Sequence, residues 1–148
     1  MTFRSGSPED TMMFAEGLAK DAEAGDVFCL LGELGAGKTA FAKGFARGLA
    51  ITGHVNSPTF TIMQMYDSGR LPMYHFDLYR LMDFAELDAE ALEDIGFFEY
   101  LDGDGVCLVE WAECAREFMP GDARWVEIRR AKDGSAADER EIYVRGLL

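Results

Sequence analysis

One eight-residue stretch constrains this chain more than any other: residues 32 to 39, with the sequence GELGAGKT. It matches G-x-x-x-x-G-K-[ST] at every fixed position, which is the pattern of a phosphate-binding loop. The glycines permit backbone angles closed to other residues, so successive N–H groups can turn inward around phosphate oxygens. Lys38 would place its charge on the β- and γ-phosphates, and the Thr39 hydroxyl is a hard ligand suited to Mg²⁺. We expect nucleotide contacts from Glu33, Leu34, Gly35, Ala36, Gly37, Lys38, Thr39 and Ala40.

The residues on either side of this loop predict a strand before it and a helix after it. Val27 to Leu31 is a short apolar run, typical of a strand buried on both faces. Phe41, Phe45 and Leu49 recur every four residues, as on one face of a helix. The N-terminus of that helix would direct its partial positive charge at the same anion. This context argues against an accidental match and predicts a nucleoside triphosphate site with Mg²⁺.

The base is predicted to be adenine, because a common guanine-recognition motif is missing. Guanine-specific GTPases commonly carry an Asn-Lys-x-Asp sequence. The only asparagine of this chain, Asn56, is followed by Ser57. ATP is therefore favoured over GTP.

The remaining pattern predicts one α/β domain over residues 1–148, since no repeat or linker divides the chain. Ser7 reads as the cap of a helix that continues through Thr11 to Ala24. Four apolar residues are expected on the buried face of that helix: Met13, Phe14, Leu18 and Ala22.

Further elements follow the loop and its helix. Residues 60–66 and 71–77 predict two strands joined by a turn, and residues 84–92 predict an acidic helix. Residues 106–109 predict a second buried strand. The tail predicts a closing hairpin, with strands at 125–129 and 142–145.

Two carboxylates follow predicted strands and could complete a metal site. Glu110 comes directly after the strand at 106–109, and Asp77 ends the strand at 71–77. A phosphate loop commonly works with such an acid at the end of a buried strand. The plainer alternative for each is a solvated carboxylate at a strand end. Thr59, in a polar segment that Pro58 stiffens, is either a γ-phosphate sensor or part of an ordinary turn.

Other side chains leave their roles open. Trp111 either packs beside the nucleotide or lies in the core, and His75 reads as a strand residue. Cys29 and Cys107 lie in apolar runs and read as buried thiols.

The net charge of −13 bears on partners. A nucleic-acid binder needs a basic face, and this chain has only four lysines, so autonomous binding to RNA or DNA is not expected. An acidic surface suits a basic protein partner, or simply keeps the protein soluble. No apolar run approaches the roughly 20 residues of a membrane span, and no signal peptide is evident, so we expect a cytosolic protein.

Four motifs in this order resemble the TsaE (YjeE) family of small bacterial ATPases required for threonylcarbamoyladenosine formation in tRNA. They are the loop at 32–39, Ser57-Pro58-Thr59-Phe60, the HFDLYR segment at 75–80 and Val109-Glu110-Trp111. The last three motifs make the resemblance specific, because the loop alone belongs to a vast superfamily. The C-terminal hairpin carries no motif of the family.

This resemblance implies an α/β P-loop fold in three layers, with a mixed central sheet flanked by helices. It implies that Lys38 and Thr39 hold phosphate and Mg²⁺, and that Asp77 and Glu110 lie at the metal and the attacking water. It puts Thr59 in a switch-like loop and Trp111 near the nucleotide. It also implies two partners, the transferase TsaD and its paralogue TsaB, whose repeated turnover ATP hydrolysis would support.

Two competing functions share the loop. A small-molecule kinase would need an arginine-bearing lid over the phosphates, and no arginine-rich lid segment follows Thr39. A nucleotide-sensing module would need less acid near the γ-phosphate than Asp77 and Glu110 supply. We therefore expect an ATPase, slow in isolation because no arginine finger accompanies the loop in the sequence.

Overall fold

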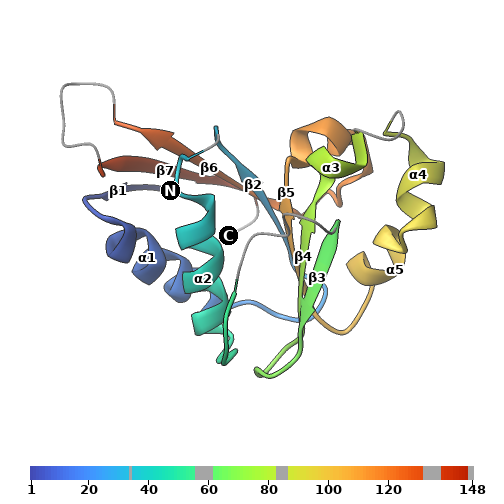
Figure 1. Ribbon diagram of the computed structural model, residues 1–148, viewed down its shortest axis with the longest axis horizontal. Coiled ribbons are helices and arrows are strands. Elements are labelled where there is room, and N and C mark those ends of the chain that lie inside the picture. The colour runs from blue at the N-terminus through green and yellow to red at the C-terminus, as the bar shows by residue number, and fades with distance from the viewer. Residues whose placement is uncertain (34, 56–61, 83–86, 132–137, 147–148) are drawn as a thin grey trace.

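The computed structural model describes residues 1–33, 35–55, 62–82, 87–131 and 138–146. These residues form a seven-stranded mixed sheet with helices on both faces, as expected (Figure 1). The strands are β1 (Thr2–Ser5), β2 (Val27–Leu31), β3 (Met63–Tyr66), β4 (Met73–Asp77), β5 (Val106–Glu110), β6 (Arg124–Arg130) and β7 (Arg140–Arg145). The helices are α1 (Pro8–Lys20), α2 (Lys38–Gly48), α3 (Leu78–Met82), α4 (Ala89–Asp94), α5 (Phe97–Leu101) and the 3₁₀ helix η1 (Ala112–Phe118).

Four parallel strands form the middle of the sheet. Its order is β1-β7-β6-β2-β5-β4-β3, with β6, β2, β5 and β4 parallel and the outer pairs antiparallel. In β2, Phe28 and Leu30 join the core on the α1–α2 side, while Val27 and Cys29 join the core on the other face. Parallel strands end at the same edge of a sheet. The carboxyl ends of β2, β4 and β5 are therefore neighbours.

The two long helices pack with their backbones in contact. A Cβ atom added at Gly44 of α2 would lie 2.1 Å from the Met12 carbonyl oxygen of α1, so only glycine fits there. The Ser7 cap of α1 is confirmed, because its side chain accepts a hydrogen bond from the Asp10 N–H at 3.1 Å.

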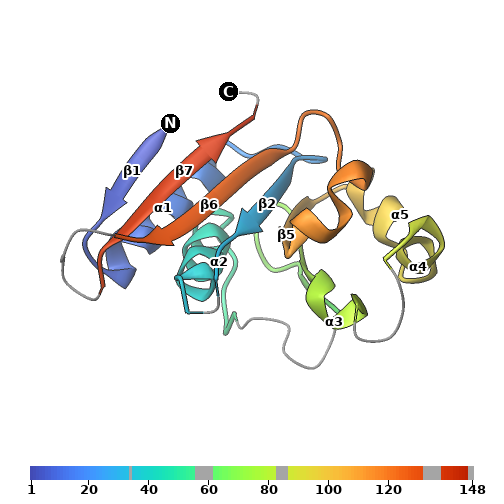
Figure 2. The same cartoon turned by 90° about the horizontal axis from the view of Figure 1, so that it is seen from above.

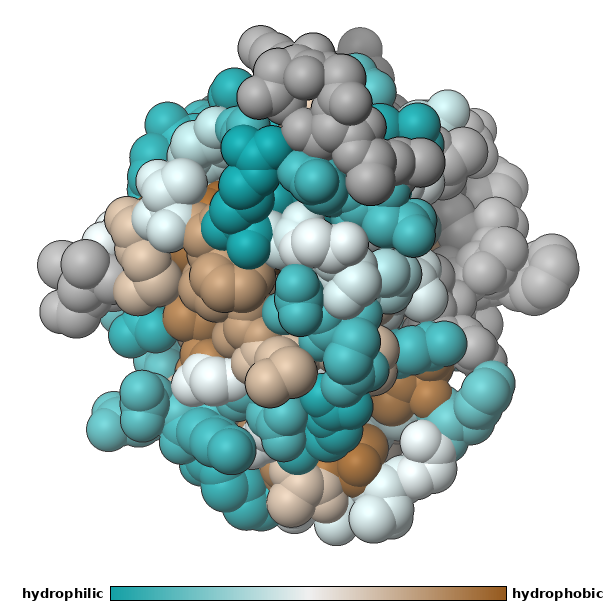
Figure 3. Space-filling model, turned by 90° about the vertical axis from the view of Figure 1, so that its left-hand side faces the viewer, coloured by the Kyte–Doolittle hydropathy of each residue, from teal (hydrophilic) through white to brown (hydrophobic). Residues whose placement is uncertain are grey.

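The predicted buried face of α1 is partly wrong. Met13 is 59% exposed, but Phe14 and Leu18 pack against the core and Ala22 is buried as expected; the fully buried positions within α1 are the small residues Thr11, Ala15 and Ala19. Close helix packing leaves room only for small side chains, so the large apolar residues lie beside the contact or in solvent. Figure 3 shows this side of the molecule, where apolar residues gather in a patch within a hydrophilic surface. The helix also ends at Lys20, before the predicted end at Ala24.

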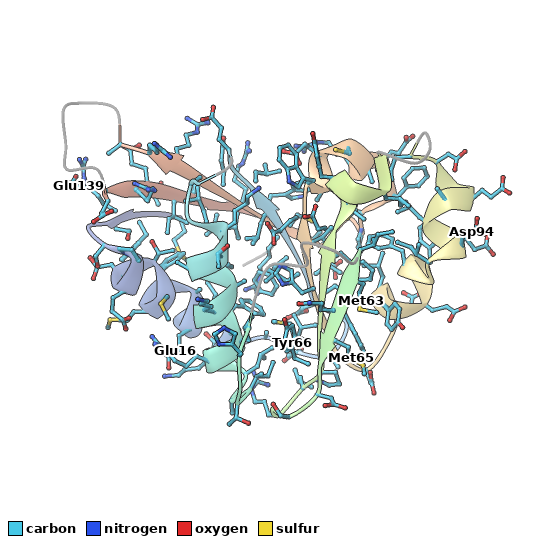
Figure 4. All side chains as sticks on the ribbon, viewed as in Figure 1. Glu16, Met63, Met65, Tyr66, Asp94 and Glu139 are labelled. Atoms are coloured by element: carbon cyan, nitrogen blue, oxygen red, sulfur yellow. The ribbon has the colours of Figure 1, made fainter. Side chains whose placement is uncertain are left out.

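Both predicted hairpins are present. β3 and β4 pair antiparallel within the ranges predicted for them, and β6 pairs antiparallel with β7. Figure 4 labels Met63, Met65 and Tyr66 on the edge strand β3. Tyr66 packs on the core, whereas Met65 is 54% exposed, as alternation along a strand requires.

The remaining elements were predicted only in part. The predicted acidic helix is observed as α4, which Asp88 caps by accepting from the Ala91 N–H, while residues 84–86 of the predicted range lie outside the described residues. Strand β1 is too short to show periodicity, and it forms only by pairing with β7. The short helices α3, α5 and η1 were also missed. Figure 2 shows α4 and α5 at the end of the molecule away from β1.

Candidate functional site

The loop between β2 and α2 has the predicted strand–loop–helix context. Gly37 occupies the N-cap of α2 with φ 116°, a left-handed conformation that favours glycine. Because Gly37 has no side chain, it cannot accept hydrogen bonds from the first N–H groups of α2. Helix α2 therefore begins at the loop without a side-chain cap, and helix starts of this kind bind anions through their first N–H groups.

Lys38 is brought to two of the other predicted site residues. Its Nζ lies 3.9 Å from Glu110 Oε1 and 4.5 Å from the centre of the Trp111 ring. The lysine is only 8% exposed, so both contacts act where water screens them weakly. The positive charge of Lys38 is therefore balanced by the Glu110 carboxylate and by the face of the Trp111 indole ring.

Glu110 has a second partner that the sequence did not reveal. His75 Nε2 lies 2.6 Å from Glu110 Oε2, and the histidine is fully buried on β4. Nδ1 of His75 has no hydrogen-bond partner among the described residues. An ionised carboxylate only accepts hydrogen bonds, so it pairs with the histidine tautomer that carries its proton on Nε2. His75 therefore holds the carboxylate oxygen of Glu110 that Lys38 does not approach, a contact that its place in a strand did not predict.

Asp77 lies beside Glu110 at the ends of neighbouring strands. The two are register partners of β4 and β5. Partial burial raises the pKa of the Asp77 carboxyl, and the negative charge of Glu110 raises it further. A hydrogen bond from the Tyr79 N–H and the charge of Lys38 act in the opposite direction. Two neighbouring carboxylates favour a bound cation or proton between them.

The donor set fits a metal ion that is shared with a ligand. Among the described residues, no three His, Cys, Asp or Glu side chains cluster as a metal site. Mg²⁺ is usually bound by one or two carboxylates together with substrate phosphates and water. Asp77, Glu110 and the exposed Thr39 at the second position of α2 suit that arrangement, and they do not form a self-contained metal cage.

Trp111 is held in an unusual backbone conformation directly after Glu110. Its φ is 62°, which is uncommon for a residue with a side chain and costs about 1 kcal/mol or more. The indole ring packs against Tyr79, with ring centroids 4.9 Å apart. The sequence left open whether Trp111 lies at the nucleotide or in the core, and the structure shows its ring both over Lys38 and packed against the core.

A cavity of about 690 Å³ opens beside the loop, which is large enough for a nucleotide-sized ligand. Its walls come from the loop, from Trp111 and η1, and from β6 and β7. Four arginines line it: Arg116, Arg129, Arg130 and Arg145. No sequence pattern predicted arginines at this place, because these four lie 77 or more positions after Thr39 in an acidic chain.

A further arginine of the C-terminal hairpin contacts the loop itself. Arg140 Nε donates to the Ala36 carbonyl oxygen at 2.8 Å, and Nη2 approaches the Gly35 carbonyl oxygen at 3.5 Å. This contact joins residues more than 100 positions apart in the chain.

The other predicted residues divide into three groups. Glu33, Gly35 and Ala40 lie in or directly after the loop, as the motif requires. Leu34 and Thr59 lie outside the described residues. Burial raises the pKa of the Cys29 and Cys107 thiols to about 12, so these cysteines act as apolar core residues.

Residues 5–142 match the model of one protein family, described as "Threonylcarbamoyl adenosine biosynthesis protein TsaE". A tRNA threonylcarbamoyladenosine biosynthesis protein TsaE from Bacillus subtilis is 49% identical over 142 residues, covering 96% of this chain and 83% of the relative. The TsaE of Treponema pallidum is 40% identical over 140 residues, covering 95% of this chain and 96% of the relative.

A solved structure has the same fold. The crystal structure of Bacillus subtilis YdiB superposes with a TM-score of 0.77 and is 44% identical, covering 96% of this chain and 82% of that one. Within the part of the chain that the structure describes, no helix is long and apolar enough to cross a membrane.

Proposed function

The chain belongs to the TsaE family of tRNA threonylcarbamoyladenosine biosynthesis proteins, and we propose that it serves that pathway by binding and hydrolysing ATP with Mg²⁺. One observation carries the proposal. The loop that opens α2 presents Lys38 beside Glu110, at the edge of the sheet where Asp77 also ends its strand. A cationic phosphate cradle next to two carboxylates is the arrangement that nucleotide hydrolysis needs.

In this proposal each side chain has a distinct task. The first N–H groups of α2 and Lys38 hold the β- and γ-phosphates, so Lys38 exchanges Glu110 for phosphate oxygens. Thr39, Asp77 and Glu110 would hold Mg²⁺, which when bound neutralises charge that develops on the phosphates. Asp77 or Glu110 orients the attacking water, and Thr59 would respond to the γ-phosphate from its own segment. Trp111 covers the loop and limits access of solvent to Lys38.

The starting arrangement also gives a reason for slow hydrolysis by the isolated chain. Glu110 is paired with Lys38 and hydrogen-bonded to His75, so Lys38 must give up the Glu110 contact to bind phosphate. A partner that favours the rearranged site would raise the rate. We assign this role to TsaD-like and TsaB-like proteins, with this chain working beside them in the cytoplasm.

The acidic charge is consistent with such a division of labour. At a net charge of −13 the chain is poorly suited to hold tRNA, which its partners would bind instead. Four arginines line the cavity beside the loop, but Glu33, Glu113 and Glu127 line it too, and Arg129 pairs with Glu127 at 2.9 Å.

The direct test is phosphate release from ATP, measured for the chain alone and with TsaD-like and TsaB-like proteins added. We expect slow release alone, faster release with both partners, and loss of release in Lys38→Ala. Lys43→Ala is the matched control, because Lys43 lies on the same helix outside the site. No release under any combination, with ATP still bound, would favour a nucleotide-sensing module.

A further inference from the structure

The C-terminal hairpin reaches the phosphate loop through its first β7 residue. Arg140 is the register partner of Arg130 across the hairpin. Glu139, labelled in Figure 4, precedes it and pairs with Arg4 of β1 at 2.8 Å. The start of β7 is therefore held by contacts to both of its neighbouring strands, β6 and β1. These contacts fix the backbone position of Arg140 relative to the loop.

The guanidinium of Arg140 spans consecutive peptide groups. It donates to the carbonyl oxygen of Ala36 at 2.8 Å and approaches that of Gly35 at 3.5 Å, while Nη1 donates to the Glu139 carbonyl oxygen at 2.9 Å. The contacts to the Ala36 and Glu139 carbonyl oxygens are partly buried, whereas the longer contact to Gly35 is exposed. Hydrogen bonds from a charged donor are stronger than neutral ones.

These contacts constrain which way the loop N–H groups point. Every described peptide bond is trans, and in a trans peptide the C=O and N–H point in opposite directions. With the carbonyls of Gly35 and Ala36 turned toward Arg140, the N–H groups of Ala36 and Gly37 must turn away from it. The Ala36 N–H in fact points back into the loop, where it meets the Glu33 carbonyl oxygen at 3.0 Å.

We propose that Arg140 is a positioning residue that holds the loop in its phosphate-binding shape from behind. The C-terminal hairpin would thus be a working part of the nucleotide site, supplied by a segment with no nucleotide-binding motif of its own. This inference rests on the proposed binding of ATP. A loop that is already ordered loses less entropy when the ligand binds.

Two other roles for Arg140 make different predictions. An arginine that contacts the γ-phosphate would affect ATP but not ADP, and would mainly lower the hydrolysis rate. An arginine that acts only by its charge would be replaced without loss by lysine, and its effect would fade in salt. A backbone clamp affects ATP and ADP alike, since both carry the β-phosphate, and needs the shape of the guanidinium.

The test is calorimetric titration of the parent chain, Arg140→Met and Arg140→Lys with ATP and with ADP, each with Mg²⁺. We expect Arg140→Met to raise both dissociation constants about tenfold and Arg140→Lys about fivefold. Both losses should persist at about 0.5 M salt, where exposed charges are screened. The hydrolysis rate at saturating ATP should change less than twofold.

Arg70→Met is the matched control. Arg70 also donates to backbone carbonyls, those of Ala19, Lys20 and Ala22 at the end of α1, far along the chain from the loop. We expect it to lower the melting temperature while leaving both dissociation constants unchanged. If Arg70→Met weakened nucleotide binding as much as Arg140→Met, the effect would be one of general stability and the proposal would fall.

Three further results would overturn the proposal. They are unchanged binding in Arg140→Met, a loss confined to ATP, and full rescue by lysine. A parent chain that binds neither nucleotide would instead reject the proposed function itself, which separates the two failures.

Discussion

Charged side chains approach the phosphate loop from two sides, which differ in sign, burial and origin. The acidic side consists of Asp77 and Glu110, with His75 behind them, at the ends of two central strands. The arginine side consists of five residues from η1 and the C-terminal hairpin: Arg116, Arg129, Arg130, Arg140 and Arg145. Glu110 is 4% exposed, whereas most of these arginines lie in solvent.

This difference indicates a division of tasks. The buried Glu110 carboxylate is held in one orientation by Lys38 and His75. Because water screens it weakly, it would interact strongly with a metal ion or water molecule that takes the place of Lys38, which suits a role in hydrolysis. Exposed arginines are screened by water and contribute mainly to attracting and holding an anionic ligand. Changes on the acidic side should therefore alter the hydrolysis rate, and changes on the arginine side should alter affinity.

The largest effect is expected for Glu110→Gln. Removing the carboxylate charge should lower partner-stimulated phosphate release at least about a hundredfold, as loss of an acid–base or metal-binding group does. The dissociation constant for ATP should stay within about threefold, because Lys38 and the loop remain. Glu117→Gln, on the exposed part of η1, is the control. A rate within a few-fold of the parent would remove Glu110 from the chemical step.

A tenfold effect is expected from His75→Leu. Without the donated hydrogen bond, Glu110 keeps its charge but loses its fixed orientation, so the maximal rate should fall about tenfold while KM changes little. His75→Gln retains an N–H at about the position of Nε2, and it should restore most of the rate. Equal losses in both variants, matched by equal falls in melting temperature, would reduce His75 to a packing residue.

On the arginine side, a smaller effect on ATP affinity is expected from Arg130→Met. A Cβ atom added at Gly35 would lie 3.0 Å from Arg130 Nη2, so this guanidinium lies beside the loop. Because Arg130 is exposed, its loss should raise the dissociation constant for ATP about threefold, with the saturated hydrolysis rate unchanged. A fall in the saturated rate would break the proposed division between the two sides.

The smallest effect is a pH-dependent gain of stability in Asp77→Asn. Because the pKa of Asp77 is raised in the folded chain, the folded state binds its proton more tightly than the unfolded state. The associated stability is present below the ordinary pKa and is lost as the pH rises through the folded-state value. In metal-free buffer the variant should therefore melt above the parent near pH 7, with a difference that shrinks towards about pH 4. Asp122→Asn, an exposed change, should show no such trend.

The sequence predicted the acidic side better than the arginine side, for a physical reason. The loop, its strand and its helix are local patterns, and parallel strands must bring their carboxyl ends together. Asp77 and Glu110 could thus be assigned from their places at strand ends.

Contacts between distant segments were not predictable in the same way. His75 meets Glu110 across 35 positions, and Arg140 meets Ala36 across 104. No spacing in the sequence predicts either contact, because the first depends on the order of the strands in the sheet and the second on how the C-terminal hairpin packs. The exposure of Met13 in α1 could not be predicted from the sequence either, since it follows from the close approach of α2 at Gly44.

The proposed function requires that Lys38 and the loop hold the phosphates of ATP. The most direct measurement is a calorimetric titration of the chain with ATP and Mg²⁺, beside Lys38→Ala and Lys43→Ala. We predict one bound ATP for each parent chain, affinity at least about thirtyfold weaker in Lys38→Ala, and unchanged affinity in Lys43→Ala. Equal ATP affinity in the parent chain and Lys38→Ala would contradict the account.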